Sequence, residues 1–240
     1  MLFRSSMSSL AKQPSLAVLP FANLGQDEQN EYFSDGLAEE LINALSQVSG
    51  LKVIARTSAF AFKGKNQDVR QIAEALGVTN VLEGSVRRSG NRVRVTVQLI
   101  QAVDGTQLWS QCFDRELTDV FEIQDEIAQA IAEQLKVKLG DSSATARQTA
   151  NMEAYEDVLA GRHALFKFTP AGLEHAYERL QHAISLDPNY AYAHASMAEY
   201  HVHQATVGTA LHRDALLKAE AAALRSLELD SLSEIGRAHV

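Results

Sequence analysis

The pattern of apolar positions divides the chain into two parts. Up to about residue 140, short runs rich in Val and Ile alternate with amphipathic stretches, whereas from residue 151 onward Ala and Leu recur at helical spacing. β-Branched residues favour strands, and Ala and Leu favour helices. The pattern therefore predicts an α/β mixed-sheet domain over residues 14–140, followed by an all-helical region over residues 151–233.

The first part is predicted to follow the order β-α-β-α-β-β-β-α. Its clearest strand begins at Arg92, where apolar and charged residues alternate, as expected for a strand with one buried and one solvated face. Turn signals at Ser89-Gly90-Asn91 and at Asp104-Gly105 predict that the last three strands form antiparallel hairpins. The five expected strands are residues 15–21, 51–57, 80–88, 92–100 and 107–114.

The three helices predicted between these strands have recognisable starts and ends. Ser, Asp and Asn side chains accept hydrogen bonds from the first free amides of a helix, and Gly favours the left-handed conformation after its last turn. Asp68 with Gln71, and Asp119 with Glu122, also have capping-box spacing. The expected starts are at Ser34 or Asp35, at Asp68 and at Asp119, and the expected ends are at Gly50, Gly77 and Gly140.

The second part is predicted to contain four helices, over residues 151–168, 170–186, 190–203 and 213–229. Two similar helix endings, Leu186-Asp187-Pro188 and Leu229-Asp230-Ser231, are 43 residues apart. This spacing of helix pairs resembles the tetratricopeptide (TPR) repeat, although the units are longer than its usual period of about 34 residues. The resemblance rests on Gly161, Ala176, Ala183, Pro188, Tyr192, Ala198 and Tyr200.

Composition and charge narrow the classes of function. The chain of 240 residues has 22 Lys and Arg against 30 Asp and Glu, a net charge of −8, which argues against non-specific binding to nucleic acid or to an anionic membrane. A single cysteine, Cys112, permits no intramolecular disulfide. No apolar run is long enough to span a bilayer, and the first 14 residues lack the apolar centre of a secretory signal. The chain as written is expected to be soluble.

The residues offer no catalytic, cofactor or metal site. The first 140 residues contain no histidine, and Lys63-Gly64-Lys65 lacks the second glycine of a phosphate-binding loop. Neighbouring carboxylates such as Glu39 and Glu40, or Asp125 and Glu126, diverge on a helix and are interpreted as solvated surface. His194, His201 and His203 allow two interpretations, as metal ligands or as polar residues on the surface of the repeats. The second is favoured because no carboxylate or cysteine completes a set of metal ligands.

One cluster of basic residues allows two interpretations. Arg87, Arg88, Arg92 and Arg94 flank the predicted turn at Gly90, with Arg56, Lys63 and Lys65 elsewhere in the domain. The four arginines could form a docking patch for an acidic partner or an anion. Alternatively, they are a charged hairpin tip that protects the sheet from edge-to-edge association, which is the interpretation favoured here.

Five blocks of the first part resemble a known family. They are residues 15–21 (SLAVLPF), 32–37 (YFSDGL), 51–57 (LKVIART), 81–86 (VLEGSV) and 121–127 (FEIQDEI). Their order is similar to that of the TolB-like amino-terminal domain that precedes TPR repeats in bacterial adenylate-cyclase-like proteins and CadC-type transcriptional activators. The resemblance implies a regulatory or scaffolding half, with a cyclase or winged-helix output domain upstream, and it transfers no catalytic residues.

We therefore predict a non-enzymatic binding module of a bacterial signalling protein, whose helical repeats present a groove to a protein or peptide partner. The alternatives are the regulatory half of a nucleotide cyclase, the regulatory half of a membrane-linked winged-helix regulator, and an α/β domain that binds a small ligand by itself. The compartment is cytoplasmic or periplasmic, depending on an upstream membrane helix.

Three further segments are expected from their composition. Residues 1–13 are predicted to be disordered, and residues 141–150, which are small and polar, to form a linker. Residues 234–240 look like the translation of a sequencing-adapter oligonucleotide and are excluded from the fold. About two repeats are visible where a stable array needs about three, so the array is expected to continue in the natural protein.

Overall fold

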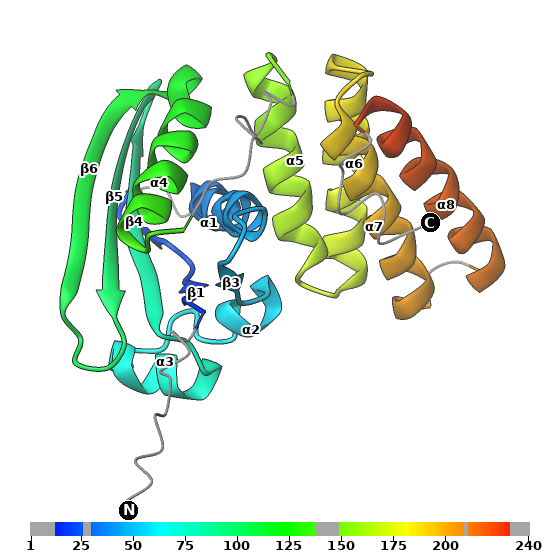
Figure 1. Cartoon of the computed structure of the whole chain (residues 1–240). Coiled ribbons are helices and arrows are strands. Elements are labelled where there is room, and N and C mark those ends of the chain that lie inside the picture. Colours follow the sequence, from blue (N-terminus) through cyan, green and yellow to red (C-terminus); the bar gives the residue numbers. More distant parts are fainter. Residues whose placement is uncertain (1–12, 26–29, 138–148, 209–210, 231–240) are drawn as a thin grey trace, which may run out of the picture.

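The computed structural model describes residues 13–25, 30–137, 149–208 and 211–230. In this part of the chain a mixed sheet, with helices on both faces, is followed by a stack of four helices (Figure 1). This arrangement confirms the predicted order of an α/β region followed by helices. Most of the predicted linker, most of the predicted disordered segment and the predicted artefactual tail lie outside the described residues.

The sheet combines a parallel and an antiparallel half. Strand β1 (Ser15–Val18) lies between β3 (Lys52–Val53) and β4 (Asn80–Ser89) and is parallel to both. Strands β4, β5 (Arg92–Gln101) and β6 (Gln107–Glu116) form an antiparallel meander, as the two turn signals predict. The strand order is β3-β1-β4-β5-β6, so β6 is an edge strand.

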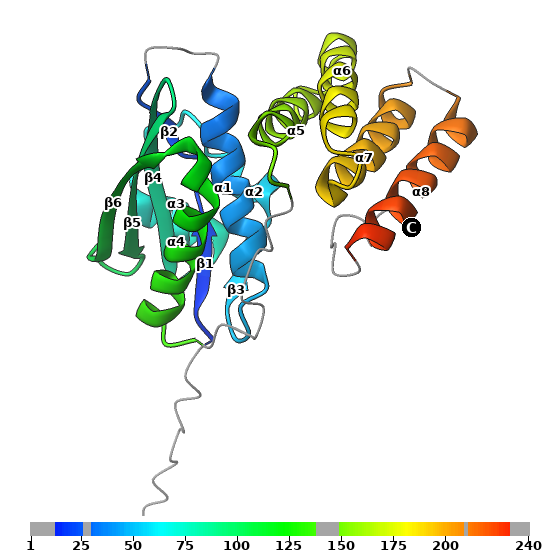
Figure 2. The same cartoon turned by 90° about the horizontal axis from the view of Figure 1, so that it is seen from above.

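The helices cover the two faces of the sheet unequally. Helices α1 (Glu31–Ser46) and α4 (Val120–Gln134) pack on one face, where the alternating valines of β5 are fully buried. On the other face, α3 (Val69–Leu76) covers β1 and the start of β4 through Ile72 and Ala73. Figure 2 shows α1 and α4 on the same side of strands β4 to β6. The rest of the outer face of these strands carries polar side chains, many of them exposed.

Two strand predictions need correction. The predicted strand over 51–57 is wrong beyond Val53, because β1 offers this edge strand partners only at Ser15 and Leu16, and α2 (Arg56–Phe60) follows instead. The predicted strand over 15–21 ends at Val18. After residues 19–21, the chain pairs with β4 again as the two-residue strand β2 (Ala22–Asn23), which is not among the predicted strands.

The helix boundaries also differ from expectation in the first and last helices of the sheet region. Ser34 and Asp35 do not cap α1, because the helix begins one turn earlier and both side chains are buried inside it. Helix α4 ends well before residue 140, and its Asp119 makes no side-chain capping hydrogen bond. The predictions for α3 are confirmed in part: Asp68 Oδ1 accepts from the Arg70 amide at 2.9 Å, and Gly77 ends the helix at φ +67°.

The four predicted helices of the second part are all present. They are α5 (Met152–Leu165), α6 (Pro170–Leu186), α7 (Ala191–Val207) and α8 (His212–Leu229). Consecutive helices pack against each other through small residues: a Cβ on Gly161 would lie 2.9 Å from Leu180 Cγ, so α5 and α6 can approach this closely only with glycine there. Asn151 and Thr169 cap α5 and α6 through their side chains.

The close packing of Gly84 on β4 against β5 and Phe21 gives a test of the fold. A Cβ on Gly84 would lie 2.6 Å from the Thr96 carbonyl oxygen and 3.1 Å from the Phe21 ring. Because backbone cannot yield cheaply, we expect G84A to lower the free energy of unfolding by about 1–3 kcal/mol, measured by urea denaturation. The matched variant S110A, on the exposed side of β6, should stay within about 0.5 kcal/mol of the wild type. Equal stability of the two variants would contradict this packing.

Candidate functional site: a buried charged interface and an exposed leucine stripe

The helical region is joined to the sheet region by a continuous apolar core. Tyr155 and Leu159 of α5 are buried within the core that α1 and α4 form on the sheet, and the Tyr155 ring lies 4.8 Å from that of Phe121. Leu159 packs directly over Gly36 of α1, where a side chain would meet it at 2.7 Å. Helix α1 therefore lies between the sheet and α5 (Figure 1).

A buried guanidinium holds three helices together at this interface. Arg162 of α5 is only 4% exposed. Its Nε and Nη2 both donate to Glu39 Oε1 of α1, the Nε bond being 3.0 Å long, and its Nη1 donates to Glu199 Oε2 of α7 at 2.6 Å. Nη1 also lies 3.3 Å from Ser196 Oγ. Such charge-assisted bonds fix both distance and direction, so Arg162 sets the mutual position of α1, α5 and α7.

Arg56 of the unexpected helix α2 completes the neutralisation of Glu39. Its Nε donates to Glu39 Oε2 at 2.9 Å, so both carboxylate oxygens are engaged. The guanidinium plane lies between two aromatic rings, 4.1 Å from the centre of Phe60 and 3.6 Å from that of Phe166. Stacking of this kind stabilises a cation that has lost water. Phe166 follows α5, so this contact again links the sheet region to the helices.

A second carboxylate of α1 makes a parallel connection one turn earlier. Asp35 Oδ2 accepts from Lys63 Nζ at 2.6 Å and lies 3.1 Å from His163 Nδ1 of α5. Burial would raise the pKa of Asp35, but the hydrogen bonds from His163 and Lys63 outweigh it and hold that pKa below its usual value. Asp35 and Glu39 are four residues apart and thus point to the same neighbour, α5.

The expectation that Glu39 and Glu40 are solvated is wrong, whereas Asp125 and Glu126 are exposed as expected. Glu40 is 6% exposed, and its Oε1 has no hydrogen-bond partner among the described residues. Burial, and then the negative charge of Glu39, raise the pKa of Glu40 to about 7. Glu40 is therefore largely protonated below neutral pH.

The four arginines of the predicted docking patch do not share one surface. Arg87 and Arg94 are opposite each other on the outer face of the sheet, where Arg92 and Arg94 both bind Asp114, at 2.6 and 2.5 Å. Arg88 is paired with Val93 and points to the opposite, helix-covered face, where it binds Glu156 of α5 at 2.8 Å. Arg88 is thus a further link to the helices, and a docking role for the four arginines stays a prediction.

The three histidines that could suggest a metal site, His194, His201 and His203, each have a different partner. His194 Nε2 lies 3.0 Å from the Pro188 carbonyl, His201 Nδ1 lies 2.9 Å from Gln204 Oε1, and His203 packs edge-on against Phe166 and Phe168. Cys112 is exposed on β6. Within residues 13–25, 30–137, 149–208 and 211–230, no three His, Cys, Asp or Glu side chains gather in a way that could hold a metal ion.

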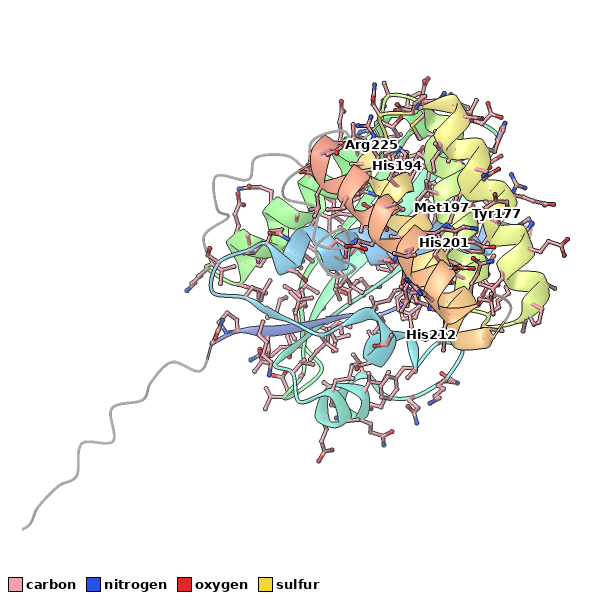
Figure 3. All side chains as sticks on the ribbon, turned by 90° about the vertical axis from the view of Figure 1, so that its right-hand side faces the viewer. Tyr177, His194, Met197, His201, His212 and Arg225 are labelled. Atoms are coloured by element: carbon pink, nitrogen blue, oxygen red, sulfur yellow. The ribbon has the colours of Figure 1, made fainter. Side chains whose placement is uncertain are left out.

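Exposed apolar side chains gather at the other end of the molecule. Figure 3 looks onto this end, where α8 lies in front of α7, which carries His194, Met197 and His201. Helix α8 packs through Ala215, Ala219, Ala223 and Ser226, which are buried. Its opposite face carries Leu217 (56% exposed), Ala221 and Leu224 (46% exposed) at helical spacing, hereafter the leucine stripe. Sequence reasoning assigned the helix correctly but did not single out this face.

Comparison with known proteins identifies the family. Residues 11–130, half of the chain, match the family model described as "HilA/YgeH-like transcriptional regulator, second domain". The chain belongs to this family. Within the described residues, no helix is both long and apolar enough to cross a membrane.

Two curated relatives extend the match beyond the sheet region. "Putative adenylate cyclase 3" of Rhizobium meliloti (strain 1021) is 43% identical over 192 residues, which cover 79% of this chain and 33% of the relative. "Transcriptional regulator HilA" of Salmonella typhimurium is 24% identical over 238 residues, covering 93% of this chain and 40% of the relative. The chain thus spans well under half of each relative. Both names are compatible with a regulatory or signalling module.

Solved structures show partial similarity. TolB from Acinetobacter baumannii is 18% identical, with a TM-score of 0.39 over 52% of this chain and 28% of that chain. Lipoprotein GNA1162 from Neisseria meningitidis is 16% identical, with a TM-score of 0.38 over 51% of this chain and 98% of that chain.

The role of Arg162 can be tested by removing its charge. R162M removes the cation that Glu39 and Glu199 share, and breaking a buried ion pair by removing one partner typically costs about 3–5 kcal/mol in the free energy of unfolding. R162M/E199Q should regain part of this loss, because residue 199 then carries no charge, whereas Glu39 keeps its ion pair with Arg56. R213M, at an exposed position of α8, is the control. Urea denaturation measures all three, and a loss below 1 kcal/mol in R162M would contradict the assigned role.

The buried carboxyl of Glu40 predicts a dependence on pH. A pKa raised from 4.5 to about 7 means that the folded state keeps a proton which the unfolded state has lost, so stability falls as pH rises between these values. E40Q cannot ionise and should gain about 2–3 kcal/mol relative to the wild type between pH 5 and pH 8. The exposed-site variant E126Q should show no such gain. A pH-independent difference between E40Q and the wild type would refute the assignment.

Proposed function

We propose that this chain is a non-catalytic regulatory module of a bacterial signalling or transcription-regulating protein, and that its helical region binds a protein or peptide partner. The observation that carries the proposal is the leucine stripe. Of the large apolar side chains that are exposed in the described part of the chain, four lie on α8 or at its start: Leu211, Leu216, Leu217 and Leu224. Exposed apolar patches on an otherwise polar surface mark interaction sites.

The packing of the helices agrees with the proposed TPR character, but it changes the surface to which we assign the partner. Gly161, Ala176 and Ala198 are buried at helix contacts, as stacked helix pairs require. The groove side that carries Tyr155, Arg162 and Glu199 is, however, occupied by α1 and its charges. We therefore assign the partner to α8 rather than to a groove along α5.

The chemistry of the stripe suits an amphipathic helix. Leu217, Ala221 and Leu224 recur at i, i+4 and i+7, which is the spacing of anchors in helix-to-helix recognition. Each Å² of this apolar stripe that a partner covers would contribute about 25 cal/mol to the free energy of association.

A second candidate concerns the larger protein in which such a module operates. The 43% identical relative named as an adenylate cyclase favours the regulatory half of a nucleotide cyclase, and the family match favours the regulatory half of a winged-helix transcriptional regulator. In both cases, the proposed role of residues 13–230 is to bind and transmit rather than to catalyse.

Photo-crosslinking tests the partner site in cells. With p-benzoylphenylalanine in place of Ala221, we expect a specific crosslinked partner, and L217E/L224E should lower its yield at least fivefold, because carboxylates cannot be buried against an apolar helix. The same probe in place of Glu178, exposed on α6, is the control.

Circular dichroism should show that L217E/L224E keeps its fold, since both side chains are exposed. A band at twice the mass of the chain would identify a second copy as the occupant. That result, or equal yields at both probe positions, would overturn the proposal.

A further inference from the structure

A cavity lies at the carboxyl end of the parallel half of the sheet. Its volume is about 540 Å³, within the range of small-molecule sites. It is bounded by residues 19–23 after β1, by the loop 62–67 between α2 and α3, and by the outer faces of β4 and β5. None of the residues in the charged interface with α5, apart from Lys63, lines it.

The topology explains why a cavity forms there. Helix α1 connects β1 to β3 over one face of the sheet, whereas α2 and α3 lead from β3 back past β1 to β4, with α3 on the other face (Figure 1). Strands β3 and β4 lie on opposite sides of β1, and the connections that lead to them run over opposite faces of the sheet, so the carboxyl end of β1 is a topological switch point. In open α/β sheets, ligands bind in the crevice at this point.

Two charged side chains that line the cavity have no counter-ion among the residues that the structure describes. Glu83 on β4 is half-buried, its side chain forms no hydrogen bond or ion pair with any residue the structure describes, and its pKa is raised by burial. Lys65 rests on the Phe62 ring, with Nζ 5.2 Å from the ring centre, and pairs with no carboxylate in the described ranges. Lys63, in contrast, is neutralised by Glu31 and Asp35 at 2.7 and 2.6 Å.

The remaining lining is divided between neutral polar groups and apolar groups. Ser85, Thr96 and Gln98 follow Glu83 on the sheet, where Glu83 faces Gln98 and Ser85 faces Thr96 in register. Asn66 and Gln67 extend the polar wall beside Lys65. The apolar wall consists of Leu19, Phe21, Phe62 and Ile72.

From this arrangement we propose that the cavity binds a small zwitterion, an α-amino acid with an apolar side chain. Its ammonium group would pair with Glu83, its carboxylate with Lys65 and the amides beside it, and its side chain with the apolar wall. A nucleotide suits the cavity poorly, because an ionised Glu83 would repel its phosphates and the loop lacks a phosphate-binding glycine pattern.

Three probes of matched shape separate the zwitterion from single charges. L-leucine carries both charges, 3-methylbutylamine lacks the carboxylate, and 4-methylpentanoate lacks the ammonium group. By isothermal titration calorimetry on the full chain, we expect L-leucine to bind at least tenfold more tightly than either of the others. Binding by the amine alone, by the carboxylate alone or by none of the three would overturn the proposal.

Two substitutions locate the site. E83Q and K65Q should each weaken L-leucine binding at least tenfold, whereas E74Q and K52Q, at exposed positions outside the cavity, should leave it unchanged. Unchanged binding in E83Q and K65Q would place the ligand elsewhere and refute this site. The measurement needs no protein partner, so it fails or succeeds independently of the leucine stripe.

Discussion

Arg162 is the constraint on which the architecture depends. A guanidinium cannot lose its proton in a protein, so once α5 packs against the sheet domain its charge must be met by carboxylates within reach. Glu39 and Glu199 come from helices on opposite sides of it, and both are held at hydrogen-bond distance. Any sliding of α5 along α1 would break these bonds while leaving the charges buried. The apolar contacts favour association, and the charged contacts select one register.

Several features follow from that register. Arg162 and Arg56 both bind Glu39, whereas the adjacent Glu40 is buried and forms no ion pair among the described residues. The pKa of Glu40 therefore rises. Arg56 loses water between two aromatic rings, which in turn fixes the short helix α2. The face of the helical stack that would line a groove is used inside the molecule. The surfaces that we propose for other molecules therefore lie at α8 and at the cavity beside β1.

The sequence predicted those elements whose signals are local. The alternation in β5, the turns at Gly90 and Gly105, the Asp68 cap and the four later helices depend on neighbours a few residues away, and all are present. The interface escaped prediction because its partners are distant: Glu39 and Arg162 are 123 residues apart. A polar pair at i and i+4 has the same pattern whether water or another helix covers it. The two-residue strand β2 carries too little pattern to be found.

The cavity and the helices are physically connected through Lys63 and Asp35. Lys63 lines the cavity and also binds Asp35, a buried carboxylate whose other partner is His163 of α5. A ligand carboxylate that drew the Lys63 ammonium toward the cavity would remove one of the two hydrogen-bond partners of Asp35 Oδ2 and leave the contact with His163. A change of charge in the cavity beside β1 thereby reaches α5 through three consecutive contacts: ligand to Lys63, Lys63 to Asp35, and Asp35 to His163. Because α5 is held to α7 by Arg162, and α7 carries α8, the leucine stripe lies at the end of one continuous series of packed elements.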